Sequence, residues 1–376
     1  MHIGIVTSFF YPRIGGAENY AYKLSIGLIK AGHTVDVFTT DTLIKQPTNE
    51  IFEGIKVRRF PSWDPIGSGW CCSPALNSAL ENADVDILHC HKIDCYPAVA
   101  AARVSRIRKI PLLITTHLGL TANRKLLHHL YFPTVGRWTL QQAKVICAVS
   151  TDEIARLSKL HCLNPAAQIE IIPSAADDTL HQIVRTIDIG SHGSNPLRVL
   201  FVGRLERSQK GIDRLEYIIN SSDERLIFTI VGDGDEKERI IKLANRFPQK
   251  VHYAGILHNK QLVDAYASSD VFIIPSRLES YPCVIAEALA AGLPVIGSDI
   301  PAIRSIISHG INGLLVNEAD NPEKWLSSLL TLAENRLLLS DFSVCARDTV
   351  SHYTWDSVVN KYMELYLFAR KIVYGN

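Results

Sequence analysis

The amino-acid sequence predicts an α/β protein with two doubly wound domains, each a parallel sheet covered by helices. Three observations support this prediction. The chain of 376 residues is long for a single hydrophobic core. Short apolar runs alternate with amphipathic stretches from one end to the other. A polar stretch rich in glycine and proline, ending near residue 196, breaks this alternation once.

The first domain is expected to span residues 1–185. Six of its apolar runs have the length of buried strands: Ile3–Thr7, Val35–Thr39, Ile87–His91, Leu112–Thr116, Val145–Val149 and Ile169–Ile172. Between the first two runs, Ala17–Lys30 carries apolar residues at helical spacing. Gly32 follows at the position where helices favour a left-handed residue, so we expect the helix to end there.

The second domain is expected to span residues 196–354, after a linker at the polar end of Ser174–Pro196. Its six strand-like runs are Leu197–Val202, Leu226–Val231, Val251–Tyr253, Val271–Ile274, Pro294–Gly297 and Gly313–Val316. The last helix, Trp355–Ile372, carries an apolar face, so we expect residues 355–376 to pack back on the first domain. Ligands of doubly wound sheets bind outside the carboxyl ends of the strands.

Composition and charge exclude several classes of protein. A net charge of +1 gives no electrostatic attraction to nucleic acid. The start, Met1–Val6, has the pattern of a strand and not of a signal peptide, and no apolar run reaches the length of a membrane span. Eight cysteines without a CxxC pair favour a reduced, cytoplasmic protein.

Three patterns resemble parts of metal sites, and we expect none of them to bind metal. In His89–His91, strand alternation would point the two histidines to one face and the cysteine to the other. The two aspartates of Asp84–Asp86 precede a strand, which is the wrong end for a ligand site. Those of Asp233–Asp235 lie in a tight turn before a helix, whose dipole favours acidic residues.

A first candidate site follows the run Leu197–Val202. Gly203–Leu205 comes next, and Lys210 stands just before a helical stretch. Two cations beside a helix N-terminus suit a diphosphate, with Arg204 as a two-pronged donor and Lys210 as a point charge. From this segment alone, a solvated basic loop is the alternative.

A second candidate site follows the run Val271–Ile274. Glu287 is the one charged residue of an apolar helix, and a buried carboxylate requires a hydroxyl or N–H partner. A ribose diol would supply this partner, as would a structural contact within the protein. Glu279 lies in the loop before the helix, where it either addresses sugar hydroxyls or faces solvent. The N–H groups of Ser280 and Tyr281 would lie near the helix start, available to a sugar or a phosphate.

In the first domain, two features are expected at the carboxyl edge of the sheet. Gly15 and Gly16 precede the first helix, where the missing side chains let backbone approach a ligand closely. The pair falls short of a complete dinucleotide-binding fingerprint. His117 follows Leu112–Thr116 and is expected at the same edge, as either a functional or a structural residue.

Together these residues resemble the retaining glycosyltransferases of family GT4 (glycosyltransferase group 1), which have the GT-B fold of two Rossmann-like domains facing across a cleft. The resemblance covers nearly the whole chain. Its motifs are the glycine loop Gly15–Glu18, the diphosphate motif of Gly203–Leu205 with Lys210, and the E-x7-E pair of Glu279 and Glu287.

For the second domain, the resemblance implies that Glu287 holds the ribose, Arg204 and Lys210 the diphosphate, and Glu279 the hydroxyls of the donor sugar. Two departures from the family pattern accompany these roles. The interval between Arg204 and Lys210 is one residue wider than the commonest form. Ser280–Pro282 reads Ser-Tyr-Pro where Gly-Phe-Pro is more usual, a change that bears on sugar preference.

For the first domain, the resemblance implies that Gly16 offers its backbone to the phosphate and that His117 contacts the donor sugar near the reacting carbon. The implied reaction moves a hexosyl unit from a UDP-sugar or GDP-mannose to a glycan or lipid-linked acceptor, with retention. Arg204, Lys210 and a helix N-terminus would stabilise the leaving diphosphate, so we expect no metal and no other cofactor.

One segment raises the question of membrane contact. Residues 123–140 mix basic side chains with aliphatic and aromatic ones. Such a segment could rest on an anionic membrane at its inner face and admit a lipid-linked acceptor. A pair of core-packing helices with a break at Pro133 is the preferred interpretation.

Three other functions suit a related architecture. A non-hydrolysing nucleotide-sugar epimerase would isomerise the donor without an acceptor, and the E-x7-E pair argues against it. A non-catalytic nucleotide-sugar-binding protein would release no nucleotide, and the full set of candidate residues argues against it. A glycan phosphorylase with pyridoxal phosphate would have a longer chain.

Overall fold

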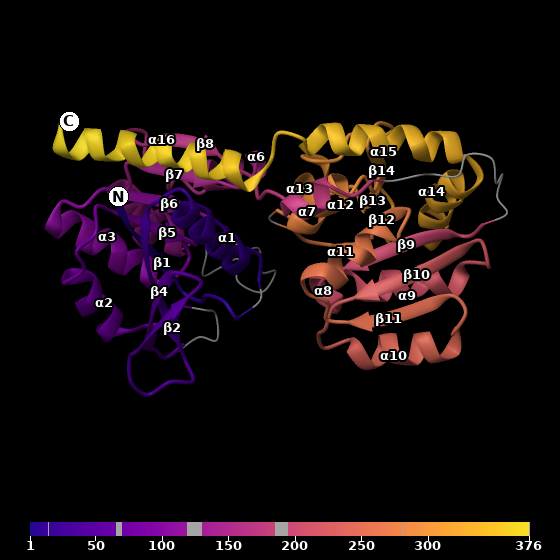
Figure 1. Ribbon diagram of the computed structural model, residues 1–376, viewed down its shortest axis with the longest axis horizontal. Coiled ribbons are helices and arrows are strands. Elements are labelled where there is room, and N and C mark those ends of the chain that lie inside the picture. Colours follow the sequence, from indigo (N-terminus) through magenta and orange to yellow (C-terminus); the bar gives the residue numbers. More distant parts are fainter. Residues whose placement is uncertain (14, 65–69, 119–129, 185–194, 280, 376) are drawn as a thin grey trace. The chain divides into compact units, whose positions relative to one another are not determined.

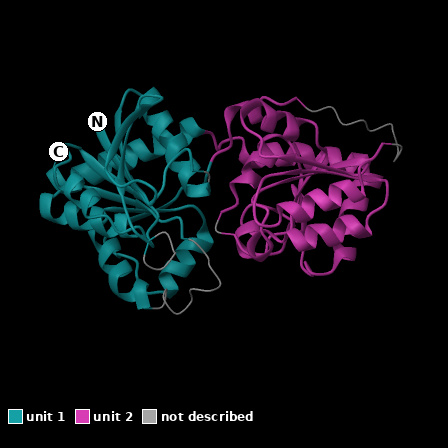
Figure 2. Ribbon diagram, turned by 90° about the horizontal axis from the view of Figure 1, so that it is seen from below, with its two compact units in different colours: residues 1–174, 355–376 teal, residues 175–354 magenta. Residues whose placement is uncertain are grey.

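The computed structural model describes residues 1–13, 15–64, 70–118, 130–184, 195–279 and 281–375. The chain divides into two compact units, which Figure 2 shows in different colours. Unit 1 comprises Met1–Ser174 and Trp355–Asn376, and unit 2 comprises Ala175–Thr354. Both units are α/β, as the sequence predicts.

Unit 1 contains an eight-stranded sheet in the order β3-β4-β2-β1-β5-β6-β7-β8. Its strands are β1 (His2–Thr7), β2 (Thr34–Asp41), β3 (Thr48–Phe52), β4 (Ile55–Pro61), β5 (Ile87–His91), β6 (Leu112–Thr115), β7 (Val145–Ala148) and β8 (Gln168–Ile171). All neighbours are parallel except β3, which is antiparallel to β4. Each of the six predicted runs forms a strand, with bounds that agree to within two residues.

The hairpin of β3 and β4 is additional to the prediction. The two strands join at Glu53 and Gly54, whose φ angles of 49° and 82° are the left-handed pair of a tight hairpin turn. Four of the five residues of β3 are exposed, because this strand lies at the edge of the sheet. An exposed edge strand carries no continuous apolar run, so hydrophobic patterning does not reveal it.

The helices of unit 1 include the chain's last one. They are α1 (Gly16–Lys30), α2 (Pro74–Glu81), α3 (Tyr96–Arg108), the π-helix η2 (Phe132–Gly136), α5 (Arg137–Gln142), α6 (Thr151–Lys159) and α16 (Trp355–Tyr374). Gly32, with φ 84°, follows the end of α1 as predicted. In Figure 1, α16 (yellow) lies along unit 1, and it packs on α1 and β6. Tyr362 and Tyr366 of α16 are completely buried.

Unit 2 contains a six-stranded sheet in the order β11-β10-β9-β12-β13-β14, with all neighbours parallel. Its strands are β9 (Leu197–Val202), β10 (Leu226–Val231), β11 (Val251–Gly255), β12 (Val271–Ile274), β13 (Val295–Ser298) and β14 (Gly313–Val316). From β9 the chain adds β10 and β11 on one side and β12 to β14 on the other. The order of strands therefore reverses between β9 and β12, which marks the expected ligand position of such a sheet.

The helices of unit 2 are α7 (Asp178–His181), α8 (Arg207–Lys210), α9 (Ile212–Ser221), α10 (Lys237–Arg246), α11 (Asn259–Ala267), α12 (Cys283–Ala290), α13 (Pro301–Arg304), α14 (Pro322–Glu334) and α15 (Arg336–Val350). Unit 2 begins at Ala175, before the linker that the sequence suggests. The reason is α7, which packs on α11 and α12 and buries Leu180 in the core of unit 2. Gly292, with φ 73°, follows the end of α12 in the left-handed conformation that glycine favours.

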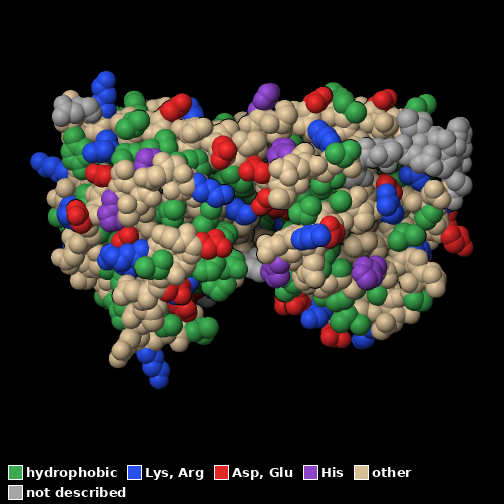
Figure 3. All heavy atoms as spheres, in the orientation of Figure 1, with side chains coloured by type: hydrophobic (Ala, Val, Ile, Leu, Met, Phe, Trp, Pro, Cys, Tyr) green, Lys and Arg blue, Asp and Glu red, His purple; other side chains and the backbone are tan. Residues whose placement is uncertain are grey.

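The surface carries both signs of charge. On the face in Figure 3, basic and acidic side chains are interspersed over each unit. Within the described residues, no helix combines the length and the apolar character that crossing a bilayer requires.

Part of the candidate membrane segment, residues 123–129, lies outside the described residues. In the remainder, Phe132 and Leu140 are buried in the core, whereas Leu130 and Val135 are 64% and 39% exposed. The described part therefore packs partly in the core, but the predicted break at Pro133 is wrong, because Pro133 lies within η2, which continues into α5. Membrane contact stays a prediction.

Candidate functional site

The candidate site of unit 2 lies where β9 and β12 end side by side. Val271 and Phe272 of β12 pair with Val199 and Leu200 of β9. Both strands run in the same direction, so the loops that follow them leave from the same edge of the sheet. These two loops carry Arg204 and Glu279, which are two of the predicted donor-binding residues.

The loop after β9 is held by its backbone. The N–H of Gly203 donates to the carbonyl of Val231 at 3.0 Å, and that of Leu205 donates to the carbonyl of Asp233 at 2.8 Å. The Arg204 side chain is 61% exposed, with Glu206 3.8 Å away as its ion-pair partner. A fixed backbone therefore presents an accessible guanidinium, which suits a phosphate ligand.

Gly232 permits the close packing of this loop. Its φ is 137°, and a Cβ atom there would overlap the carbonyl oxygen of Gly203. The neighbouring Asp233 accepts a hydrogen bond from the N–H of Gly234 at 2.8 Å, so its carboxylate stabilises the turn. The Asp233 carboxylate therefore has a structural role in this turn.

Lys210 and Glu279 meet across the two loops. Lys210 ends the short helix α8, which takes up the wide interval after Arg204. Its Nζ lies 2.6 Å from Oε1 of Glu279, and the Ser276 hydroxyl donates to the same oxygen at 2.7 Å. The Glu279 side chain is only 8% exposed and that of Lys210 23%. The structure brings these two predicted residues together.

A second ion pair, between Arg277 and Asp213, also holds the loop that carries Glu279. The Arg277 guanidinium binds both carboxylate oxygens of Asp213 on α9, at 2.6 and 2.8 Å. The backbone N–H of Arg277 donates to the carbonyl of Gln209 at 2.7 Å. Because a bidentate pair has a defined geometry, Arg277 holds the loop after β12 against the start of α9.

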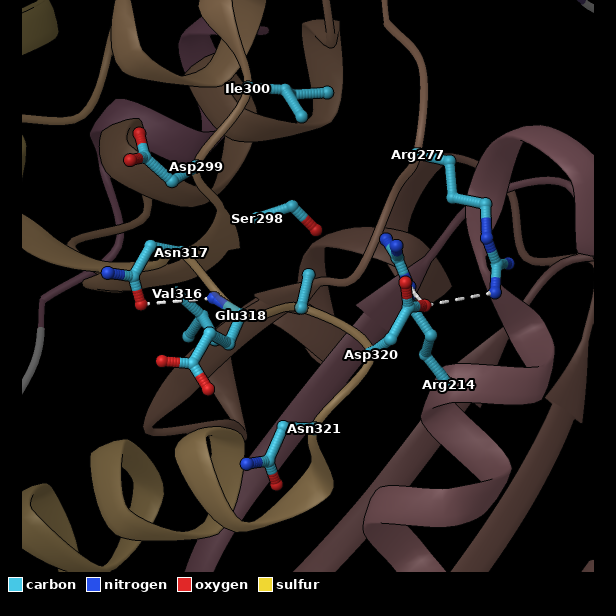
Figure 4. A pocket seen from close by; sticks show the side chains of 11 residues that line it. Arg214, Arg277, Ser298, Asp299, Ile300, Val316, Asn317, Glu318, Asp320 and Asn321 are labelled. Atoms are coloured by element: carbon cyan, nitrogen blue, oxygen red, sulfur yellow. Dashed lines mark hydrogen bonds and ion pairs between the residues drawn. The ribbon is translucent and has the colours of Figure 1, made fainter.

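A polar cavity of about 500 Å³ adjoins this network (Figure 4). Arg214 and Arg277 flank it near Asp320, and Arg214 donates to that carboxylate at 2.7 Å. The ends of β13 and β14 supply the opposite wall. None of the predicted donor-binding residues lines this cavity, so it is a neighbour of the candidate site and not the site itself.

Glu287 has the hydroxyl partner that the sequence requires. The Tyr266 hydroxyl, on α11, donates to Oε2 of Glu287 at 2.8 Å. Burial and the adjacent Glu287 charge raise the pKa of Tyr266, so it remains a neutral donor. Burial also raises the pKa of Tyr281, just before α12, while Ser280 lies outside the described residues.

The predicted glycines of unit 1 form the start of α1. Gly15 is its N-cap in extended conformation, and Gly16 is its first residue. A Cβ atom on Gly16 would meet nothing within 4 Å, whereas one on Gly15 would meet the Glu18 carboxylate. Backbone at Gly16 is therefore open to an approaching group. The N–H groups of the first turn of α1 face the same end of the helix.

His117 follows β6 in a left-handed conformation, with φ 38°. A side chain other than glycine is strained there, and such strain gathers at functional sites. His117 Nε2 lies 3.0 Å from Nδ1 of His91, at the end of β5. Burial and the positive charge of Lys92 lower the pKa of His117 to about 3, so its ring is neutral near pH 7.

The neighbouring His89 belongs to a directed chain of hydroxyl groups. Tyr20 donates to the carbonyl of Ile172 at 3.2 Å, so it accepts from Tyr362, 3.0 Å away. Tyr362 then accepts from Thr115, at 2.9 Å. Each hydroxyl has one hydrogen, so the bond from Tyr20 to the carbonyl of Ile172 sets the direction of the other hydrogen bonds in this series.

This series of hydrogen-bonded hydroxyl groups determines the tautomer of His89. Thr115 accepts from His89 Nε2 at 2.8 Å, so Nε2 carries the hydrogen. Burial lowers the pKa of His89, and Nδ1 of the neutral ring accepts from the Tyr366 hydroxyl at 2.7 Å. His89 and His91 lie on one face of β5 with ring centroids 4.2 Å apart, while Cys90 packs in the core. This is the alternation that the sequence predicts.

Several residues of the site were not predicted. Tyr266, Ser276 and Arg277 bind or position the two predicted glutamates. The sequence pattern at His91 suggested only a metal ligand and did not predict its contact with His117. The signal available for both histidines was their place at the ends of adjacent strands β5 and β6.

Two family models match the chain. One, described as Glycosyltransferase Family 4, matches residues 14–180. The other, described as Glycosyl transferases group 1, matches residues 196–335. Together they span most of both units.

The chain is similar to two named mannosyltransferases over nearly its whole length. A GDP-mannose-dependent alpha-mannosyltransferase of Mycolicibacterium smegmatis is 28% identical over 382 residues, which cover 96% of each chain. A phosphatidyl-myo-inositol mannosyltransferase of Mycobacterium leprae is 25% identical, covering 97% of this chain and 96% of its own.

Solved structures show the same fold. Sucrose-phosphate synthase from Thermosynechococcus elongatus has a TM-score of 0.76 at 20% identity, covering 98% of this chain and 99% of its own. HepE from Anabaena, solved in complex with UDP, has a TM-score of 0.75 at 18% identity, covering 97% and 99%.

Proposed function

Because this chain belongs to glycosyltransferase family 4 and has the GT-B fold, we propose that it transfers a hexosyl unit from a nucleotide-diphosphate sugar to a glycan or lipid-linked acceptor, with retention of configuration. The observation that carries this proposal is the contact between Lys210 and Glu279, which joins the two loops at this edge of the sheet. The first of these loops also carries the exposed Arg204. The positive charges of Arg204 and Lys210 suit the diphosphate of a nucleotide sugar, and the Glu279 carboxylate suits its sugar.

Each half of the donor has a candidate partner in unit 2. When the sugar–oxygen bond breaks, negative charge develops on the β-phosphate. Arg204 and Lys210 stabilise that charge, so the reaction proceeds without a divalent metal. Glu279 accepts hydrogen bonds from the sugar hydroxyls, and Glu287 accepts from the ribose. In unit 1, Gly16 offers backbone to the phosphate and His117 contacts the sugar.

GDP-mannose is the donor to test first. Both relatives named above are mannosyltransferases that match this chain end to end, and one is described as GDP-mannose-dependent. The other acts on a phosphatidyl-inositol, which supports a lipid-linked acceptor as one class to test. UDP-sugars remain the second series, and no further cofactor is required.

Thermal unfolding with GDP, UDP, ADP and their sugar conjugates, with and without EDTA, tests the donor site. A ligand at 100 times its dissociation constant stabilises the folded protein by about 2.7 kcal/mol, which raises the melting temperature measurably. We expect one nucleotide series to produce this shift in EDTA. Arg204→Gln should reduce it, whereas Arg246→Gln on α10 is the matched control and should not.

Activity and stereochemistry complete the test. With an acceptor extract, the protein should release nucleoside diphosphate, and NMR of the new linkage should show the anomeric configuration of the donor. The absence of any nucleotide-dependent shift would contradict the proposed function. An inverted product would contradict retention, and loss of activity in EDTA would contradict metal independence.

A further inference from the structure

The contact between His91 and His117 joins the ends of two adjacent strands. The rings lie nearly parallel, with centroids 5.3 Å apart and an interplanar angle of 21°. His91 Nδ1 and His117 Nε2 are 3.0 Å apart, which is a hydrogen-bond distance. His117 uses Nε2 for this bond, so Nδ1 is the nitrogen left for a ligand.

Both rings are neutral near pH 7. Burial and the neighbouring histidines lower the pKa of His91, and burial with Lys92 lowers that of His117. Among the described residues, the rings of His89 and Tyr20 also lie close to this pair. A neutral imidazole has one N–H, so one of the two rings donates and the other accepts.

The second nitrogen of His91 decides which ring donates. His91 is completely buried, and its Nε2 has no hydrogen-bond partner among the described residues. If His117 donated, His91 would carry its hydrogen on Nε2, which would leave a buried N–H unpaired. If His91 donates from Nδ1, Nε2 is a bare lone pair. In proteins, buried N–H groups without a partner are rarer than buried acceptor atoms without one.

We propose that His91 is a positioning residue, which donates from Nδ1 to His117 Nε2 and so holds His117 in the Nδ1–H tautomer. This inference rests on the proposed function, in which His117 contacts the donor sugar. His117 then presents a neutral N–H, so the group it recognises is an oxygen acceptor, such as a sugar hydroxyl or a phosphate oxygen. A neutral N–H donor does not act as the general base.

Two variants of His91 separate positioning from packing. In His91→Asn, the side-chain amide can still donate to His117. In His91→Asp, the carboxylate can only accept, so His117 must move its hydrogen to Nε2. The carboxylate also raises the pKa of His117. We expect kcat of His91→Asn to stay within about threefold of wild type and that of His91→Asp to fall at least tenfold, as for loss of a transition-state donor.

The tautomer is measured directly, by long-range ¹H–¹⁵N correlation of ¹⁵N-histidine-labelled protein without substrate. We expect His117 in the Nδ1–H form in wild type and His91→Asn, and in the Nε2–H or charged form in His91→Asp. An Nε2–H tautomer in wild type would overturn the proposal, even if His91→Asp failed to fold. So would equal kcat in wild type and His91→Asp.

The outcomes distinguish this inference from the proposed function. The tautomer of His117 can be measured in a protein that has no activity. A wild-type protein that transferred no sugar would contradict the proposed function, and the tautomer would still test the hydrogen-bond assignment. A pH profile adds a readout that packing would not move. The kcat of His91→Asp should depend on pH near neutrality, because its His117 titrates there, and that of wild type should not.

Discussion

Lys210 and Glu279 differ in what each offers a ligand, although they bind one another. Lys210 brings a positive charge from α8, and Glu279 brings an acceptor that Ser276 also binds. A nucleoside diphosphate would compete for the ammonium group, while a sugar would compete for the carboxylate. The two halves of the donor therefore depend on different members of one ion pair.

Substitutions should separate these two contributions. In Lys210→Met, the dissociation constant for the free nucleoside diphosphate should rise about ten- to hundredfold, because a hydrogen bond between charged groups is lost. In Glu279→Gln, the constant for the nucleotide should change little and that for the nucleotide sugar should rise. Titration calorimetry measures both. Equal effects of Glu279→Gln on nucleotide and nucleotide sugar would contradict the assignment of Glu279 to the sugar.

At the same scale, the sequence predicted which residues require partners better than it predicted the partners. An acidic residue in an apolar helix signalled that Glu287 must be hydrogen-bonded. Its partner, Tyr266, lies on a different helix, α11, and only the tertiary fold brings the hydroxyl within hydrogen-bond distance of Glu287. The Arg277–Asp213 pair was missed for the same reason, since 64 residues separate its members along the chain.

Among the elements, the strands could be predicted and the edge hairpin could not. Buried parallel strands such as β7 and β12 are apolar along their length, so periodicity and length locate them. β3 is polar and exposed, and its signal was the Glu53–Gly54 turn that follows it. Helix α7 escaped prediction because four residues are too few to show a helical period.

The turn between β10 and α10 acts as a support for the loop that carries Arg204. Gly232→Ala should destabilise unit 2 and weaken nucleotide binding, because its Cβ would displace the carbonyl of Gly203. Gly255 is the matched control, since it too has a positive φ, 67°, and a Cβ there would meet nothing within 4 Å. Gly255→Ala should therefore cost only the conformational penalty, about 1–2 kcal/mol.

Urea unfolding and nucleotide titration of the two glycine variants measure this difference. We expect Gly232→Ala to lose more stability than Gly255→Ala and to lose nucleotide affinity as well. If the two variants behaved alike, the close approach of the turn to the Arg204 loop would not be what shapes the site.

For the whole molecule, three histidines with lowered pKa values couple stability to pH. Their pKa values are lowered in the folded protein, so His89, His91 and His117 bind protons more readily when unfolded. Their contribution is fully present above the unfolded pKa of about 6.5 and is lost as pH falls below it. From pH 7.5 to 5.5, the free energy of unfolding should decrease by roughly 4 kcal/mol.

The urea midpoint at pH 7.5, 6.5 and 5.5 tests this coupling. His117→Asn, which removes one of the three titrating groups, should show a smaller decrease than wild type. His258→Asn is the control, because His258 precedes α11 in unit 2 and lies outside the cluster. A midpoint that stays constant over this range would contradict the neutral assignment of the three rings.

The chain crosses from one unit to the other twice, after Ser174 and after Thr354, because α16 belongs to unit 1. A ribosome therefore releases α16 only after every residue of unit 2 has been made. Until then, the nascent unit 1 lacks Tyr362 and Tyr366, the hydroxyl partners of Thr115 and His89. The unit whose synthesis begins first is completed last, so it is the one that most depends on protection against aggregation during translation.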